Sequence, residues 1–218
     1  FINKHIIKVL IGTRRSGKST ILKQIIDSLI KQGIPEDNIV WINFELSDYF
    51  EIDNIKKLEE FISHKTENIE GKIYLFFDEI QVVPQWEKLI NYYFAKENYD
   101  IYLTGSNSKL LSGEFATYLS GRYVELNIYS FSFREYLDYY EITSDFKTHF
   151  YRYLEDGGMP STFDYSGDDK RLILMDLYNS IVLKDIIQRN NVKNVDLLER
   201  IMRFVMYNIS QPFSANKI

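Results

Sequence analysis

Residues 12–20 read GTRRSGKST, and this stretch constrains the fold more than any other part of the chain. It fits the pattern G-x-x-x-x-G-K-[ST], which forms a phosphate-binding loop where it follows a strand and opens a helix. The apolar run HIIKVLIG at 5–12 predicts the strand, and helical periodicity over 17–32 predicts the helix. We therefore expect a strand, a phosphate-binding loop and a helix in direct succession.

Strand-length apolar runs and helical segments alternate through the first 130 residues. Besides 5–12, the predicted strands are NIVWINFE, KIYLFFDE, YDIYLTGS and RYVELNI, at 38–45, 72–79, 99–106 and 122–128. Two further helices are predicted over 52–66 and 85–97. This alternation is typical of an α/β fold in which crossover helices cover a mostly parallel sheet, here of five strands.

Beyond residue 130 the pattern changes to helices alone. The helical segments read SFREYLDYYE, DFKTHFYRYLEDGG, DKRLILMDLYNSIVLKDIIQR and VDLLERIMRFVMYNIS. We expect a P-loop α/β domain over 1–130, a helical lid subdomain over 131–210 and the start of a further domain, a winged helix, over 211–218. The chain opens on Phe1 and ends as this new segment begins, which indicates a fragment of a longer protein.

Composition excludes several classes of function. Lys and Arg number 26 against 31 Asp and Glu, so a chain-wide basic surface is excluded and nucleic-acid binding is not demanded. The absence of cysteine excludes disulfides and thiolate metal sites, and the three histidines lack ligand spacing. No apolar run approaches the ~20 residues that cross a bilayer, and no secretory leader is seen, so we expect a cytoplasmic protein without a membrane partner.

The residue types of the loop suit phosphate chemistry. Backbone N–H groups can converge on phosphate oxygens where no Cβ intervenes, which explains Gly12 and Gly17. Lys18 would hold the β and γ phosphates, and the hydroxyl of Ser19 would bind Mg²⁺. We expect the whole loop to contact the nucleotide: Gly12, Thr13, Arg14, Arg15, Ser16, Gly17, Lys18, Ser19 and Thr20.

Polar residues at two further strand ends would complete such a site. Asp78 would hold the magnesium shell and Glu79 would polarise water, because strand alternation directs the two carboxylates to different sides. The alternative is a solvated acidic pair. After the strand at 99–106, Thr104, Ser106 and Asn107 are candidates for contact with the γ-phosphate and the attacking water, or else Ser106 and Asn107 cap the next helix.

Five segments together resemble the AAA+ superfamily of P-loop ATPases: GTRRSGKST, IYLFFDEIQVVPQWEKLI, LTGSNSKLLS, LSGRYVELNIYSFSFREYL and YLEDGGMPSTF. The chain most resembles the prokaryotic ATPases in which this domain precedes a winged helix and a nuclease-like domain of unknown role. The resemblance implies that the strand at 99–106 separates the Asp78 strand from the loop strand. It also implies adenine rather than guanine, and the guanine-reading pattern [NT]-K-x-D is not obvious here.

The resemblance implies roles for four more residues. Arg14 and Arg15 could reach the phosphates, the adenine, a neighbouring subunit or the lid, or could be solvated cations that raise the local potential. Arg122 matches an arginine finger that reaches the γ-phosphate of the next subunit, worth ~10³ to 10⁵ in rate; the alternative is a surface ion pair. Pro160 in GGMP would pack near the adenine, or would simply open a helix after a glycine stop.

The expected function is that of an ATP hydrolase. ATP and Mg²⁺ would bind beside the lid, with Lys18, Glu79 and Arg122 as catalytic residues and Ser19 and Asp78 on the metal. Expected partners are ATP and ADP, further copies of the chain, and DNA through a C-terminal domain beyond this sequence. The alternative is a slow nucleotide-gated switch, in which ATP holds the sheet domain and the lid together.

Overall fold

Five parallel strands form one sheet in the order β2-β3-β4-β1-β5 in the computed structural model, which describes residues 1–106, 119–181, 186–187 and 192–212. The strands are β1 Ile7–Gly12, β2 Ile39–Asn43, β3 Ile73–Asp78, β4 Tyr99–Ser106 and β5 Tyr123–Asn127. The α/β fold and the five predicted strands are confirmed. The strand order is also the expected one, since β4 separates the Asp78 strand from the loop strand.

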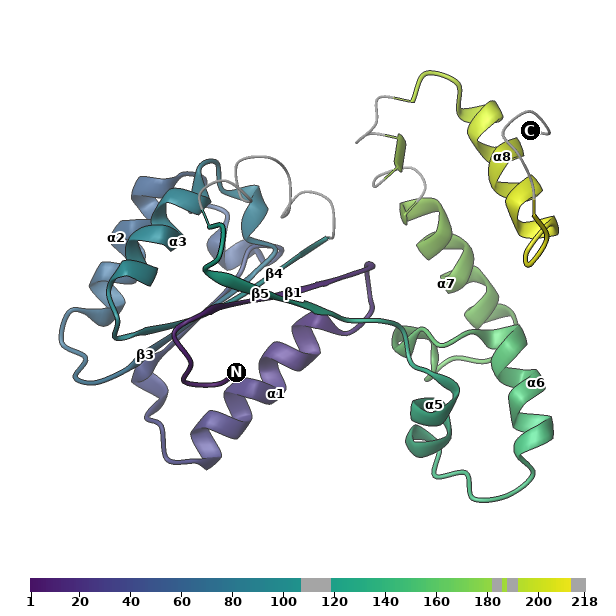
Figure 1. Cartoon of the computed structure of the whole chain (residues 1–218), viewed down its shortest axis with the longest axis horizontal. Helices are drawn as coiled ribbons and strands as arrows, with labels where there is room; N and C mark the ends of the chain where they lie inside the picture. The colour runs from purple at the N-terminus through teal and green to yellow at the C-terminus, as the bar shows by residue number, and fades with distance from the viewer. Residues whose placement is uncertain (107–118, 182–185, 188–191, 213–218) are drawn as a thin grey trace. The chain divides into compact units, whose positions relative to one another are not determined.

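Helices cover both faces of the sheet (Figure 1). Helix α1 (Lys18–Lys31) packs on one face through Leu22 and Leu29, and α2 (Ile55–Thr66) and α3 (Trp86–Ala95) pack on the other. Burial from both sides explains why β1 and β3 are continuous apolar runs rather than alternating ones. Three short 3₁₀ helices lie between these elements: η1 Glu36–Asn38, η2 Ser47–Tyr49 and η3 Ile80–Val82.

A buried ion pair joins β1 to β4 near the start of both strands. Lys8 and Asp100 are each 1% exposed, and the ammonium of Lys8 donates to the Asp100 carboxylate. Oδ2 of the same carboxylate accepts from Tyr102 Oη (3.1 Å) and from the backbone N–H of Asn3 (2.9 Å). Burial lowers the pKa of Lys8, and the Asp100 charge opposes that shift. This network holds the amino-terminal segment at the end of the sheet where β1 and β4 begin, opposite the phosphate-binding loop.

An aromatic cluster follows β5. It contains α5 (Phe133–Tyr139), α6 (Phe146–Asp156) and the 3₁₀ turn η4 (Pro160–Thr162). Its core consists of Tyr136, Leu137 and Phe163, with Phe131, Phe133, Ile142 and Tyr153 packed around them. Ser132 and Glu135 form a capping box at the start of α5, which explains where that helix begins.

The chain divides into two compact units, Phe1–Asp164 and Tyr165–Ile218. Helices α5 and α6 belong to the first unit, whereas α7 (Gly167–Ser180) and α8 (Val195–Tyr207) belong to the second. The predicted lid over 131–210 includes helices of both units, and its boundaries stay a prediction. Most of the predicted segment 211–218 lies outside the described residues. None of the helices in the described ranges combines the length and apolar character needed to cross a membrane.

Candidate functional site

The predicted loop joins β1 directly to α1. Gly17 has a φ of +101°, a left-handed conformation that favours glycine, and its carbonyl accepts from Ile21 N–H (2.9 Å) in the first turn of α1. Gly12 has a different constraint, because an added Cβ would lie 2.2 Å from the carbonyl oxygen of Ile128. Both glycines were expected to serve one purpose, which is to leave room for phosphate. The structure shows that Gly12 also makes room for the chain leaving β5.

Lys18 is 5% exposed and lies folded against its own loop. Its Nζ donates to the carbonyl oxygens of Gly12 (3.1 Å) and Thr13 (3.0 Å). Burial lowers its pKa, while the charges of Glu79 and Asp78 raise it and that of Arg14 lowers it further. Beside it, the buried hydroxyl of Ser16 has no hydrogen-bond partner among the described residues. A buried ammonium and an unpaired buried hydroxyl together favour an anionic ligand at this loop.

Thr104 connects the carboxylate of Asp78 with the backbone of Glu79. Its hydroxyl is fully buried; it donates to Asp78 Oδ1 and accepts from the backbone N–H of Glu79 (3.1 Å). Of the three candidates on this strand, Thr104 therefore contacts Asp78 and Glu79. Ser106 ends β4 in register with Gly12, but its side chain, like the whole of Asn107, lies outside the described residues.

Glu79 does not continue the strand. Strand β3 ends at Asp78, and Glu79 has left-handed backbone angles (φ 58°, ψ 42°). Strand alternation therefore does not set the direction of its side chain. The two side chains still differ in environment: Asp78 is 1% exposed and Glu79 is partly exposed. Burial raises the pKa of Glu79, whereas the Gln81 side chain and the Lys18 charge lower it.

Sequence reasoning missed two residues beside Glu79. The amide of Gln81 donates to the Glu79 carboxylate, and the charge of Glu45, two residues beyond β2, raises the pKa of Glu79. The carboxyl ends of parallel strands meet at one edge of the sheet, so Glu45 could have been found by the rule applied to β3 and β4. Gln81 had no comparable signal, because its contact depends on the turn that follows Glu79.

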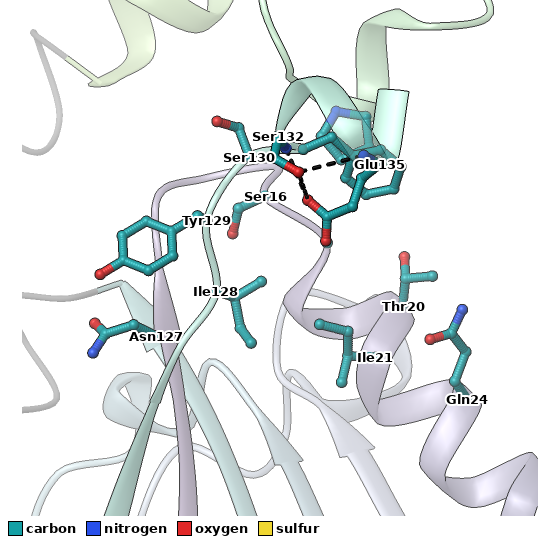
Figure 2. A pocket seen from close by; sticks show the side chains of 13 residues that line it. Ser16, Thr20, Ile21, Gln24, Asn127, Ile128, Tyr129, Ser130, Ser132 and Glu135 are labelled. Carbon is teal, nitrogen blue, oxygen red and sulfur yellow. Dashed lines mark hydrogen bonds between the residues drawn. The ribbon is translucent and has the colours of Figure 1, made fainter. Parts of the chain in front are cut away.

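A pocket of about 670 Å³ adjoins the loop (Figure 2). Ser16, Gly17 and Thr20 line it from the loop and the start of α1, together with Ile21, and Ile128 and Pro160 line it from the chain beyond β5. The loop residues and Pro160 thus share one pocket.

Two hydrogen bonds of Phe131 attach the chain leaving β5 to α6 and to the turn before η4. The N–H of Phe131 donates to the carbonyl of Gly158 (2.7 Å), and Tyr153 Oη donates to the carbonyl of Phe131 (2.6 Å). These bonds fix the pocket wall that contains Ile128 and Pro160.

The predicted finger residue lies at the other end of the sheet. Arg122 is exposed and precedes β5, whose first residue, Tyr123, is in register with Ile7 of β1. Its guanidinium donates to Asn91 Oδ1 and lies 5.9 Å from the ring centre of Phe94, both in α3. A strand rises ~3.3 Å per residue, so the length of β1, roughly 17 Å, separates Arg122 from the loop of its own chain.

Comparison with known proteins gives the family. The sequence model of an AAA domain family matches residues 4–137, and that of a domain of unknown function matches residues 147–218. With this match, the fold and the loop define a nucleotide-binding P-loop domain. The chain belongs to the AAA domain family.

The chain is similar to two curated proteins, both of which are described as uncharacterized. One, from Haemophilus influenzae, is 40% identical over 221 residues, which cover 100% of this chain and 55% of the relative. The other, from Methanocaldococcus jannaschii, is 31% identical over 214 residues, which cover 93% of this chain and 46% of the relative. The chain thus spans about half the length of these relatives. Among solved structures, PCH-2 of C. elegans aligns with a TM-score of 0.42 and 16% identity, covering 66% of this chain and 43% of that one.

Proposed function

We propose that this chain binds ATP together with Mg²⁺ and hydrolyses the bond between the β and γ phosphates. One observation carries the proposal: Thr104 holds Asp78 and Glu79 together at the edge of the sheet where Lys18 lies. A family of nucleotide-binding domains makes ATP the natural ligand, and the paired carboxylates supply the groups that hydrolysis needs.

The loop residues suit the triphosphate. The described hydrogen bonds of Lys18 Nζ go to two loop carbonyls, so the ammonium can exchange these for phosphate oxygens without losing its burial. The unpaired hydroxyl of Ser16 supplies a further donor. Backbone N–H groups from Thr13 to Thr20, including those of Arg14, Arg15, Gly17 and Ser19, would surround the phosphates at the start of α1.

Oxygen ligands for Mg²⁺ are available from Asp78 and Ser19. Carboxylate and hydroxyl oxygens are the donors that this ion prefers, and Asp78 lies within interaction distance of Lys18. When bound, Mg²⁺ would neutralise charge on the phosphate oxygens. Thr104 would orient Asp78 from behind, since its hydroxyl already donates to Oδ1.

Glu79 would act as the general base. A water O–H bond breaks, its proton passes to the Glu79 carboxylate, the water oxygen bonds to the γ-phosphorus, and the bond to the β–γ bridging oxygen breaks to leave ADP and phosphate. Burial raises the pKa of Glu79 toward the working pH, which suits a base. Lys18 would stabilise the charge that develops on the phosphate oxygens.

The pocket beside the loop would receive the adenine and ribose. Ile21, Ile128 and Pro160 offer it apolar surface, and its volume of about 670 Å³ lies in the range of small-molecule sites, ~300 to 1,000 Å³. The preference for adenine over guanine rests on the family resemblance.

Arg122 would act on the nucleotide of a neighbouring copy. Because the length of β1 separates it from its own loop, a catalytic role requires a homo-oligomer in which subunits meet head to tail. Arg122→Ala subunits mixed into wild-type oligomers should then inhibit their neighbours. Full activity of such mixtures, with assembly intact, would exclude the role.

A nucleotide-gated switch is the second candidate. The observation that favours it is the hydrogen bond from Phe131, which lines the pocket, to Gly158, which lies between α6 and η4. The relatives are about twice as long as this chain, and we propose that the further part, a winged helix and a nuclease-like domain, receives the conformational change. DNA is a proposed partner of that part, and a cytoplasmic location is proposed for the whole.

The test is phosphate release from MgATP by the purified chain, with and without DNA, at known oligomeric state. Glu79→Gln should keep ATP binding and lose hydrolysis by ~10² to 10⁴-fold, as expected for a general base, whereas Lys18→Ala should lose binding. Glu60→Gln, on an exposed surface pair, is the matched control. Equal hydrolysis by Glu79→Gln and wild type would remove Glu79 from the mechanism. Tight binding without turnover would favour the switch.

A further inference from the structure

The backbone of Glu79 is fixed, but its side chain needs a separate restraint. The N–H of Glu79, which has left-handed backbone angles, donates to the Thr104 hydroxyl (3.1 Å). In the turn that follows, the N–H of Val83 donates to the carbonyl of Ile80 (3.0 Å). Neither contact restrains the carboxylate, which can still rotate about three side-chain bonds. A base must keep its oxygen within hydrogen-bond reach of the water it activates.

The side chain of Gln81 supplies that restraint. Its Nε2 donates to Glu79 Oε2, while its own Oε1 is buried without a hydrogen-bond partner among the described residues. An unpaired buried acceptor costs free energy, so another contact of the amide must offset the cost of leaving Oε1 unpaired. The hydrogen bond to the charged Glu79 carboxylate offsets this cost. A carboxylate can only accept hydrogen bonds, so it selects the NH₂ end of the amide.

We propose that Gln81 is a positioning residue that holds the deprotonated carboxylate of Glu79 by Oε2 and leaves Oε1 directed at the attacking water. This inference rests on the proposed role of Glu79. The residue acts through Glu79 and need not touch the nucleotide itself.

The charges around Glu79 explain why such a donor is needed. Glu45, which follows β2, and Asp78, on β3, both raise the pKa of Glu79, as does burial. Lys18, at the start of α1, opposes them, but we expect its ammonium to be shared with the phosphates of a bound nucleotide. The Gln81 amide then remains as the donor committed to the Glu79 carboxylate. Its loss should leave the carboxylate free to rotate away from the attacking water.

Two variants of Gln81 separate positioning from a merely structural role. Gln81→Met keeps the length of the side chain without the donor, and Gln81→Glu adds a second negative charge. We expect kcat for phosphate release at pH 7 to fall about tenfold in Gln81→Met, a part of the 10² to 10⁴ that a general base contributes, with little change in KM for ATP. Gln81→Glu, which removes the donor and repels the Glu79 carboxylate, should lower kcat further. Gln32→Met, at an exposed glutamine, is the matched control.

A second measurement does not depend on turnover. The affinity for a fluorescent ATP analogue should be the same in the wild type and in Gln81→Met, because Gln81 acts through Glu79 and not on the nucleotide. A loss of affinity equal to the loss of rate would overturn the inference. A rise in kcat would also overturn it, because Gln81 would then be an inhibitory clamp.

The same assays distinguish failure of this inference from failure of the proposed function. If Glu79→Gln hydrolyses ATP like the wild type, the base is wrong and the inference falls with it. If Glu79→Gln is inactive while Gln81→Met keeps its rate, the base stands and only the inference fails.

Discussion

Replacing Asp100 by Asn tests whether the Lys8–Asp100 pair is as fully removed from water as its 1% exposure indicates. The substitution keeps the shape of the side chain and an oxygen that can accept from Tyr102 and Asn3. It removes the charge that compensates Lys8. We expect the sheet-containing unit to lose about 3 to 5 kcal/mol of unfolding free energy, the cost of breaking a buried pair by removing one partner.

An independent limit supports this magnitude. Lys8 can avoid an uncompensated buried charge by losing its proton, and at pH 7 this costs a lysine of ordinary pKa about 4.6 kcal/mol, at about 1.36 kcal/mol per pKa unit. The loss therefore should not much exceed 5 kcal/mol, by the same conversion. For a chain of this size, each kcal/mol lowers the melting temperature by ~2 to 4 °C, so the variant should melt roughly 6 to 20 °C lower.

The pH dependence provides the sharper assay. In Asp100→Asn the folded-state pKa of Lys8 lies further below its unfolded value, so between these two values the unfolded state binds more protons and stability rises with pH. Urea unfolding from pH 7 to 10 should therefore show that the loss of unfolding free energy relative to wild type shrinks by up to ~1.4 kcal/mol per pH unit.

Adding Lys8→Met to Asp100→Asn should recover most of this loss of unfolding free energy. A loss of unfolding free energy below ~1 kcal/mol in Asp100→Asn, which is typical of surface pairs, would refute the interpretation that the pair is removed from water. A loss that stays constant with pH would show that Lys8 keeps its proton. Asp53→Asn, at the exposed pair with Lys57, is the matched control.

Three further predictions concern the site. Thr104→Val should cost about 2 to 4 kcal/mol in urea unfolding, because one hydrogen bond to a carboxylate and one to a backbone N–H are lost, and phosphate release should fall with it; Thr104→Ser should preserve both. Gly12→Ala should weaken binding of a fluorescent ATP analogue by about tenfold or more, since its Cβ would meet the Ile128 carbonyl at 2.2 Å and displace the loop; wild-type affinity would contradict the close approach. Tyr153→Phe should lower thermal stability by about 1 kcal/mol through loss of the 2.6 Å bond to Phe131, and an unchanged melting curve would show that this bond contributes nothing.

Strands β1 and β3 could be predicted from the sequence because burial from both sides makes them continuous apolar runs. The predicted run at 72–79 and the observed β3, Ile73–Asp78, differ by one residue at each end. The order of strands was not contained in these runs. It came from the resemblance, since apolar pattern alone does not say that β4 lies between β3 and β1.

The site could be predicted only where a residue type follows from the chemistry. A phosphate-binding loop calls for a carboxylate at a nearby strand end, so Asp78 and Glu79 stood out. The left-handed turn at Glu79 had no sequence signal, because this conformation is adopted mainly by glycine and asparagine. The Gln81 contact depends on that turn, so it could not be found before the structure.

The strand order also sets a sequence of events for the growing chain. Strand β1 is synthesised first, yet it pairs only with β4 and β5 within the described residues, and Lys8 lies 92 positions from Asp100. Strands β2, β3 and β4 pair with one another in chain order and can assemble before β1 is added. Contacts so distant in sequence are slow to form. We therefore expect the loop that ends β1 to be completed late, so that nucleotide would bind at the last stage of folding and stabilise the finished domain by mass action.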